Sequence, residues 1–227
     1  MATKAEKERD ARIAARQQEA KKKKDEKAAK EEIAIGHDIE AGVAIKAGAN
    51  FVDESEFAIM GALPTLYIDN KGDIPVPVIC GVGTLADCLK RRKEGASILR
   101  IRQTSAVRAD ATVVTLNNID NELKKYQGNA VLREMWLEMH GLEEADFAFL
   151  KDAEDISPLR IYAYGGICTP RDVALMMHMH CAGVFVDNSV FTSDNPRKRL
   201  KAMARAVERY DDIDEIIKLS IGTAERM

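Results

Sequence analysis

The stretch at residues 159–196, LRIYAYGGICTPRDVALMMHMHCAGVFVDNSVFTSDNP, decides the fold class. It opens with the apolar run LRIYAY, which is typical of a buried strand and is followed by two glycines. Thr169 and Pro170 form an N-cap and first-turn pair, which predicts a helix that ends near His180. A second apolar run at 183–186 predicts another strand. Strand, helix and strand in this order indicate a parallel βαβ unit.

The same alternation continues on both sides of this unit. Short apolar runs predict three earlier strands, at residues 49–55, 75–81 and 97–102. Helical patterns are predicted at residues 38–48, 85–94, 117–152 (broken near Gly128 and Gly141), 196–210 and 212–220. Strands that are apolar throughout are buried on both faces, as in parallel sheets. The pattern therefore predicts either a (β/α) barrel or an open doubly wound sheet. No G-x-G-x-x-G motif follows a strand, which weakens a dinucleotide-binding interpretation.

The first 32 residues differ from the rest of the chain. They are almost only Ala, Lys, Glu, Arg, Gln and Asp, and Ile13 is the one large apolar residue before Ile33. These are strong helix formers, but they offer no apolar stripe to bury. We therefore expect a charged extension at 1–32, followed by one domain at 33–227. The extension is expected to be a solvated helix, a disordered tail or a helix that docks on a partner.

Composition restricts the class of protein. Hydrophobic residues make up 46% and charged residues 31% of the 227 residues, and the net charge is −3. These values predict a globular cytoplasmic protein, with no reason to bind nucleic acid and no membrane span. The histidines at 178 and 180 do not share a helical face, so a metal site is not expected. Four cysteines without a C-x-x-C pair are expected to be buried thiols: Cys80, Cys88, Cys168 and Cys181.

Six motifs carry a resemblance to a known family. In chain order they are IGH (35–37), AGANFVDESE (47–56), VICG (78–81), RRKEGASILR (91–100), GGICTPRDVALMM (165–177) and GVFVDNSVFTSDNP (183–196). With these motifs, residues 33–220 resemble the synthase (lyase) subunit of pyridoxal 5'-phosphate synthase, the glutamine-dependent vitamin B6 pathway. The resemblance implies the (β/α)8 TIM-barrel fold, with chemistry in the loops after the strands.

The resemblance also implies that the barrel is incomplete. The five predicted strands correspond to the fourth to eighth of the family. The first two βα units and the third strand have no counterpart, and the charged segment 1–32 stands in their place. Five parallel strands cannot close an eight-stranded barrel, and they leave edges with unpaired backbone groups. We therefore expect the protein to be stable only within an assembly.

The catalytic lysines of the family are tested residue by residue. The resemblance implies covalent imines between sugar phosphates and two lysines, and only a primary amine forms such a bond. The first lysine precedes the histidine of IGH, His37, by five positions, where this sequence has Glu32. The second corresponds to Arg102, and arginine remains protonated. Lys30 could serve only if the register is shifted by two. We therefore expect no catalytic residue.

The phosphate site implied by the resemblance is altered. Where the family has Gly-Ser-Gly after the last strand, this sequence has Asp187, Asn188 and Ser189. An added carboxylate should repel a phosphate, and a side chain prevents close approach of backbone N–H groups. Gly165 and Gly166 match the other phosphate loop, although a tight strand-to-helix turn, which needs no ligand, is the favoured explanation. The sequence predicts a degenerate phosphate site.

Other family residues are retained. A run of carboxylates at the end of a strand invites an acid/base role, or belongs to an inherited scaffold. A basic pair on a helix matches the product-phosphate site of the family, or is simply solvated. These retained residues are His37, Asp53, Glu54, Ser55, Glu56, Lys90 and Arg91.

These observations predict a non-catalytic relative of the synthase, acting as a structural or regulatory subunit and needing no cofactor. Its expected partners are related synthase subunits or another complex. The docking surface of the family's glutaminase lies largely in the part without counterpart, so that partner is not expected. The alternative is an active subunit that makes pyridoxal phosphate from ribose 5-phosphate, glyceraldehyde 3-phosphate and ammonia. A third hypothesis is a sensor that binds a small phosphate ligand.

Overall fold

The computed structural model describes residues 33–34, 38–54, 68, 71–102, 109–186 and 188–223. The charged segment 1–32 lies outside the described residues, so its helical or disordered character stays a prediction, as does the division at residue 33.

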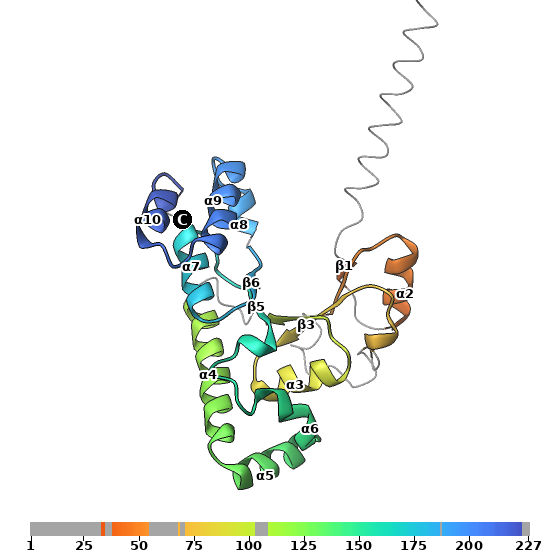
Figure 1. Ribbon diagram of the computed structural model, residues 1–227. Coiled ribbons are helices and arrows are strands. Elements are labelled where there is room, and N and C mark those ends of the chain that lie inside the picture. Colours follow the sequence, from red (N-terminus) through yellow and green to blue (C-terminus); the bar gives the residue numbers. More distant parts are fainter. Residues whose placement is uncertain are drawn as a thin grey trace, which may run out of the picture.

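The centre of the molecule is one parallel sheet of six strands, which lie in the order of the sequence (Figure 1). The strands are β1 (Ile33–Ala34), β2 (Val52–Asp53), β3 (Val78–Val82), β4 (Ile98–Ile101), β5 (Ile161–Ala163) and β6 (Gly183–Val184). All five predicted strands are confirmed as β2–β6. Sequential parallel order is the arrangement of a (β/α) barrel, because a doubly wound sheet reverses its order at a switch point.

One strand was not predicted. β1 pairs with β2 through Ile33 opposite Val52 and Ala34 opposite Asp53, on the side away from β3. The sheet therefore has a short sixth strand before the five that the sequence predicts. Two residues of pairing are too few to produce a periodic pattern, which is why the sequence did not reveal it.

Helices connect the strands at nearly the predicted positions. They are α2 (Asp38–Lys46), α3 (Leu85–Lys93), α4 (Ala109–Gln127), α5 (Ala130–His140), α6 (Glu144–Phe147), α7 (Pro170–His178), α8 (Asn188–Phe191), α9 (Pro196–Glu208) and α10 (Ile213–Ser220), with 3-10 turns η3 (Lys71–Asp73), η4 (Ala148–Leu150) and η5 (Ser157–Leu159). The predicted caps are confirmed, because Thr169 forms a capping box at α7 and Asn195 caps α9. The helix predicted from residue 117 instead begins at Ala109.

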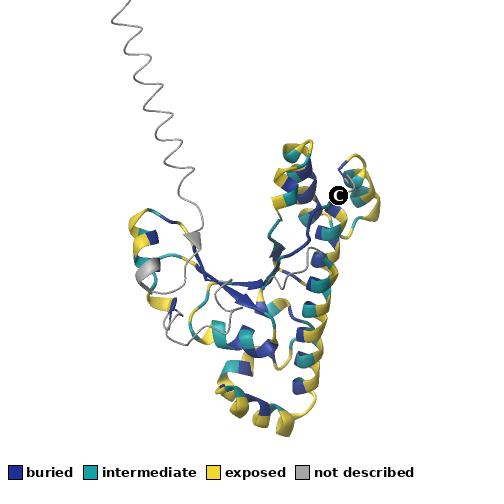
Figure 2. Ribbon diagram, turned by 180° about the vertical axis from the view of Figure 1, so that it is seen from behind, coloured by how far each residue is buried: buried dark blue, intermediate teal, exposed yellow. Residues whose placement is uncertain are grey.

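The core lies between one face of the sheet and the helices. In β4 the side chains of Leu99 and Ile101 join the core cluster that contains residues of α3, α4 and α7, whereas Arg100 points to the other face. Figures 1 and 2 show the sheet as a trough, with buried strands at its floor. We call the face that carries Arg100 the inner face, and the face that packs on the helices the helix side.

The trough is open in the described part of the chain, where β1 pairs only with β2 and β6 only with β5. The fold is therefore an incomplete (β/α)8 arrangement, as predicted. This openness matters for function, because a closed barrel shields its inner face from water and an open one does not.

Candidate functional site

Two groups of charged side chains lie on opposite sides of the sheet. They start from neighbouring residues at the end of β2, Asp53 and Glu54, whose side chains alternate between the two faces. Asp53 faces inward, where the chemistry of a barrel takes place, and Glu54 faces the helix side. Both carboxylates are nearly fully buried, so each needs a compensating charge.

The inner-face group centres on Arg100. Its guanidinium Nη2 lies 3.5 Å from the Asp53 carboxylate, and its central carbon lies 4.1 Å from the centre of the Tyr164 ring and 5.5 Å from that of Phe185. Two aromatic faces and one carboxylate hold this cation in place. A guanidinium held in this way can bind an anion or an oxygen atom, but it cannot form an imine.

Arg102, which the sequence predicts to replace the second family lysine, is turned towards Asp87 of α3. Its Nη2 donates to Oδ2 of Asp87 over 2.6 Å. That oxygen also accepts from the backbone N–H groups of Gly83 and Thr84, so the arginine completes the cap of α3. A Cβ at residue 83 would lie 3.2 Å from Nη2, so the glycine leaves room for this contact. The structure therefore gives Arg102 a structural partner.

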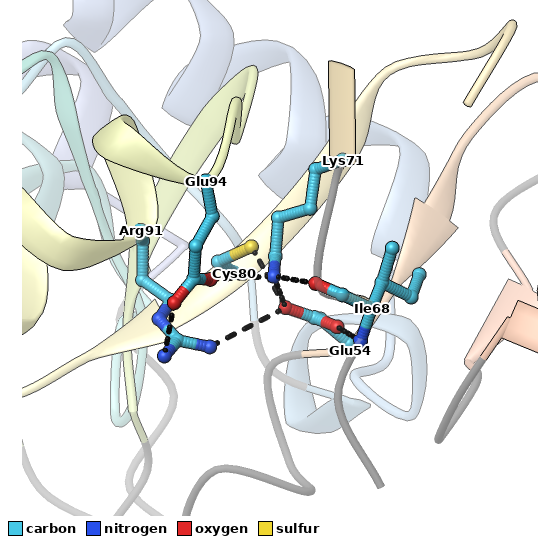
Figure 3. A network of polar contacts seen from close by, with 6 residues as sticks. All are labelled: Glu54, Ile68, Lys71, Cys80, Arg91 and Glu94. Atoms are coloured by element: carbon cyan, nitrogen blue, oxygen red, sulfur yellow. Dashed lines mark hydrogen bonds and ion pairs between the residues drawn. The ribbon is translucent and has the colours of Figure 1, made fainter. Parts of the chain in front are cut away.

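The helix-side network consists of Glu54, Lys71, Cys80, Arg91 and Glu94 (Figure 3). Lys71 is only 2% exposed, and its Nζ lies 2.6 Å from Glu94 and 2.9 Å from Glu54. Arg91 pairs with Glu94 over 2.7 Å, and the Cys80 thiol donates to Glu54 over 3.2 Å. Two carboxylates thus face two cations in the layer between β3 and α3.

Lys71 is protonated in this network. Burial alone would lower its pKa, but hydrogen bonds to Glu94 and then Glu54 outweigh burial and raise the pKa above its usual value. Nζ also donates to the backbone oxygen of Ile68 over 2.6 Å. A protonated amine with three acceptors around it has no lone pair for a sugar carbonyl. Lys71 is therefore a structural cation on the far side of the sheet from the inner face.

The distribution of lysines in the sequence extends this point. No lysine occurs in any of the six strands. None occurs in the segments that follow them, which are residues 35–37, 54–70, 83–84, 102–108, 164–169 and 185–187. In barrels, chemistry takes place at the carboxyl ends of strands and in the loops after them. This chain supplies no amine there from residue 33 onwards.

The predicted phosphate loops lie close together. Gly165 and Gly166 adopt φ angles of 104° and 69°, which side chains rarely allow. The Thr112 hydroxyl of α4 donates to the backbone oxygen of Gly165 over 3.2 Å. In the same loop, Sγ of Cys168 lies 3.1 Å from Oγ of Ser189 in α8. These contacts join the loop after β5 to α4 and to α8.

Those of the remaining predicted site residues that the structure describes do not gather into one site. Arg91 belongs to the helix-side network, and Lys90 lies on α3, partly exposed. Asn188 is exposed at the start of α8. The others lie outside the described residues, so their roles stay predictions: Glu32, His37, Ser55, Glu56 and Asp187.

The described part of the chain contains no group of three or more His, Cys, Asp or Glu side chains placed to hold a metal ion. All four cysteines are free and buried, as predicted. Among the helices that the structure describes, none is long and apolar enough to cross a membrane.

Fold and site together define a parallel (β/α) protein of barrel type, whose inner face is lined by aromatic rings and a paired arginine. Comparison with known proteins gives the family. The model of the SOR/SNZ family matches residues 26–161. The chain belongs to this family.

The relatives are named as synthase subunits. Pyridoxal 5'-phosphate synthase subunit PdxS of Clostridium novyi is 32% identical over 199 residues, which cover 86% of this chain and 84% of the relative. PdxS of Clostridium botulinum is 33% identical over 191 residues, 83% of this chain. The chain spans only 64% of the length of that relative. Subunit PDX1 of Cercospora nicotianae is 34% identical over 198 residues, 85% of this chain and 56% of the relative.

Solved structures give weaker likenesses. Thiamine phosphate pyrophosphorylase from Pyrococcus furiosus has a TM-score of 0.45 and 19% identity, covering 75% of this chain and 65% of its own. The fold assignment rests on the strand order described above.

Proposed function

We propose that this chain is a non-catalytic member of the SOR/SNZ family, acting as a structural or regulatory subunit of a larger assembly. The observation that carries the proposal is the pairing of Arg102 with Asp87, at the position where the family resemblance requires an imine-forming lysine. From residue 33 onwards, the strands and the segments between each strand and the next helix or 3-10 turn contain no lysine. Without an amine, the inner face has no group that could hold a sugar as an imine.

The assembly part of the proposal is supported by the open sheet. In the described residues β1 and β6 each have one edge without a partner strand, and unpaired edges invite pairing with another chain. The relatives are themselves named as subunits. We therefore propose related synthase subunits as partners, in the cytoplasm, where buried free thiols such as those found here are stable.

The alternative function, an active pyridoxal 5'-phosphate synthase subunit, is favoured by the family membership alone. It would require a lysine from residues 1–32, such as Lys30, or from a neighbouring chain. It would also require a substrate to displace the contacts that Arg100 makes with Asp53 and Tyr164.

An activity assay separates the two functions. The purified chain is incubated with ribose 5-phosphate, glyceraldehyde 3-phosphate and an ammonium salt, and pyridoxal phosphate is measured by its absorbance. The positive control is the Clostridium botulinum relative under the same conditions. We expect no product from this chain alone. Turnover comparable to that of the relative would refute the proposal.

The assembly is tested separately, by co-expressing the tagged chain with a synthase subunit from the same source. We expect the two to co-purify at a fixed ratio. A chain that purifies alone and stays folded would contradict the structural role, whatever the activity assay shows.

A further inference from the structure

The last helix exposes a row of isoleucines. Ile213, Ile217 and Ile221 lie four residues apart along α10 and its cap, and they are 73%, 55% and 69% exposed. Residues four apart lie on one face of a helix, so the three side chains form a continuous apolar ridge. Contiguous apolar surface of this kind marks an interaction site more often than it marks ordinary protein surface.

The ridge forms one wall of a groove, because Ile213, Ile217 and Ile221 are among the residues that line it. The groove has a volume of about 580 Å³ and lies between α10 and α7, whose Ala174, Leu175 and His178 line it together with Tyr210. Leu175 is itself exposed. Figure 1 shows α10 and α7 side by side at the end of the molecule opposite β1 and α2. The isoleucine ridge and the neighbouring side chains of α7 thus form one continuous apolar surface.

The chain's own charged segment is a poor occupant of this groove. Residues 1–32 contain a single large apolar residue after the initiating methionine, Ile13. One such side chain cannot cover three isoleucines and a groove. The partner must bring its own apolar ridge, and a second copy of this chain does so.

We propose that two copies of this chain pair through α10, with the helices antiparallel and the two-fold axis beside Ile217. A two-fold interface brings the same patch of both copies together, so residue i contacts j and j contacts i. Ile217 then meets Ile217 of the other copy, and Ile213 of each meets Ile221 of the other.

The charges beside the ridge fit this arrangement. At about 100° per residue, Asp214 and Lys218 lie on the same flank of the ridge, roughly 60° and 100° from Ile217. Reversing one helix about Ile217 brings Asp214 of each copy to within about two residues' rise, ~3 Å along the axis, of Lys218 of the other. Both residues are exposed in the single chain. An antiparallel pair therefore gains two ion pairs.

This inference does not depend on the proposed loss of catalysis. It uses only the surface of α10 and α7, which would pair in the same way in an active subunit. Activity and partner assays can therefore fail without affecting it, and its own failure leaves the proposed function intact.

Cross-linking tests the inference most sharply. The four native cysteines are buried, so Ile217→Cys adds the first exposed thiol in the described part of the chain. In the full chain under mild oxidation, we expect Ile217→Cys to give a covalent dimer at low micromolar concentration. The matched control is Met139→Cys on α5, where the native side chain is 75% exposed. Equal cross-linking of the two variants would overturn the proposal.

A charge exchange supplies the second test. Asp214→Lys alone places two lysines together across the axis, so sedimentation should show dimerisation weakened at least tenfold. Asp214→Lys with Lys218→Asp exchanges both charges and should restore it to near the native level. Thermal unfolding of each variant checks that the fold is retained. A native chain that is monomeric at 100 micromolar, or an exchange variant no better than the single one, would contradict the pairing.

Discussion

The inner face and the helix side of the sheet use neighbouring residues for different purposes. Asp53 points inward to Arg100, while Glu54 points outward to Lys71. The Lys71 amine thus lies in the helix-side network, where it stabilises the fold, and the inner face carries the Arg100 guanidinium instead. Two neighbouring carboxylates of one retained motif thus face different cations, a guanidinium on the inner face and an amine on the helix side.

The largest expected effect comes from removing the buried amine. Lys71→Met leaves Glu54 and Glu94 with less compensation in a buried layer, and breaking such a cluster costs about 3–5 kcal/mol of unfolding free energy. Urea denaturation measures this loss. The control is Lys93→Met, whose exposed pairs with Glu143 and Asp146 should matter little. Equal stability of the two variants would show that the helix-side network is not structural.

A direct comparison of the two faces comes next. Glu54→Gln weakens contacts with Lys71 and Arg91, and should cost about 2 kcal/mol, because hydrogen bonds to charged groups contribute ~1.5–3 kcal/mol. Asp53→Asn weakens the longer ion pair with Arg100, whose aromatic contacts persist, and should cost about half as much. The measurement is again urea denaturation. A larger loss for Asp53→Asn would mean that the inner-face contact, and not the helix-side network, contributes more to stability.

The unfolding free energy should also fall in alkaline solution, because buried thiols on the helix side ionise less readily than they do in the unfolded chain. Burial, and then the Glu54 carboxylate, raise the pKa of Cys80, and burial raises the pKa of Cys181 to about 12. In the unfolded chain the pKa of these thiols is about 8.5. The stability that they contribute is therefore complete below that pH and is lost as pH rises towards the folded pKa values. Each contributes a slope of about 1.4 kcal/mol per pH unit.

Lys71 follows the same direction at higher pH. The folded pKa of Lys71 lies above its usual value. The stability that Lys71 contributes is therefore lost only as pH rises from the usual pKa towards the folded pKa. Unfolding free energies measured from pH 7 to 11 should stay level at first and then fall above about pH 9. Cys80→Ala should reduce the slope. An unchanged slope in this variant would mean that the Cys80 thiol ionises in the folded protein.

A smaller loss of stability is expected from removing the ion pair at the cap of α3. Arg102→Gln removes a partly exposed ion pair with Asp87, whose oxygen still accepts from the backbone of Gly83 and Thr84. The loss should stay below about 1 kcal/mol. Thermal unfolding measures it. A loss as large as that of Lys71→Met would make Arg102 part of the core framework.

The smallest expected effect is that of Arg102→Lys on chemistry. An amine at this position would meet the same Asp87 carboxylate, remain protonated and gain no reactivity towards a sugar. Intact mass after incubation with ribose 5-phosphate should show no adduct. The paired variant, Arg102→Lys with Asp87→Asn, separates the effect of the Asp87 carboxylate from that of the residue at position 102. An adduct in the single variant would mean that the identity of residue 102 alone decides catalysis.

Much of the fold could be predicted from the sequence because local signals decided it. The start of α7 is marked locally by Thr169 and Pro170, and the start of α9 by Asn195 and Pro196. The start of α4 could not be placed, because the β-branched run after Ala109 does not favour a helix until tertiary packing buries one face.

The site was less predictable. Lys71 was missed because its partners, Glu54 and Glu94, lie 17 residues before and 23 residues after it in the sequence. No local pattern marks such a lysine, since it sits in a short polar turn before a strand. Arg102 was recognised through the family motif, but its contact with Asp87 follows from the packing of β4 beside α3. Long-range pairing of charges is therefore where sequence reasoning was weakest.

One measurement tests the central claim most directly. The native chain is incubated with ribose 5-phosphate, reduced with borohydride to fix any imine, and weighed intact, with the urea-unfolded chain as a control for surface glycation. The account predicts the same mass as the untreated protein, 25.1 kDa. A sugar phosphate bound to one lysine of the folded chain, and absent from the unfolded control, would contradict it.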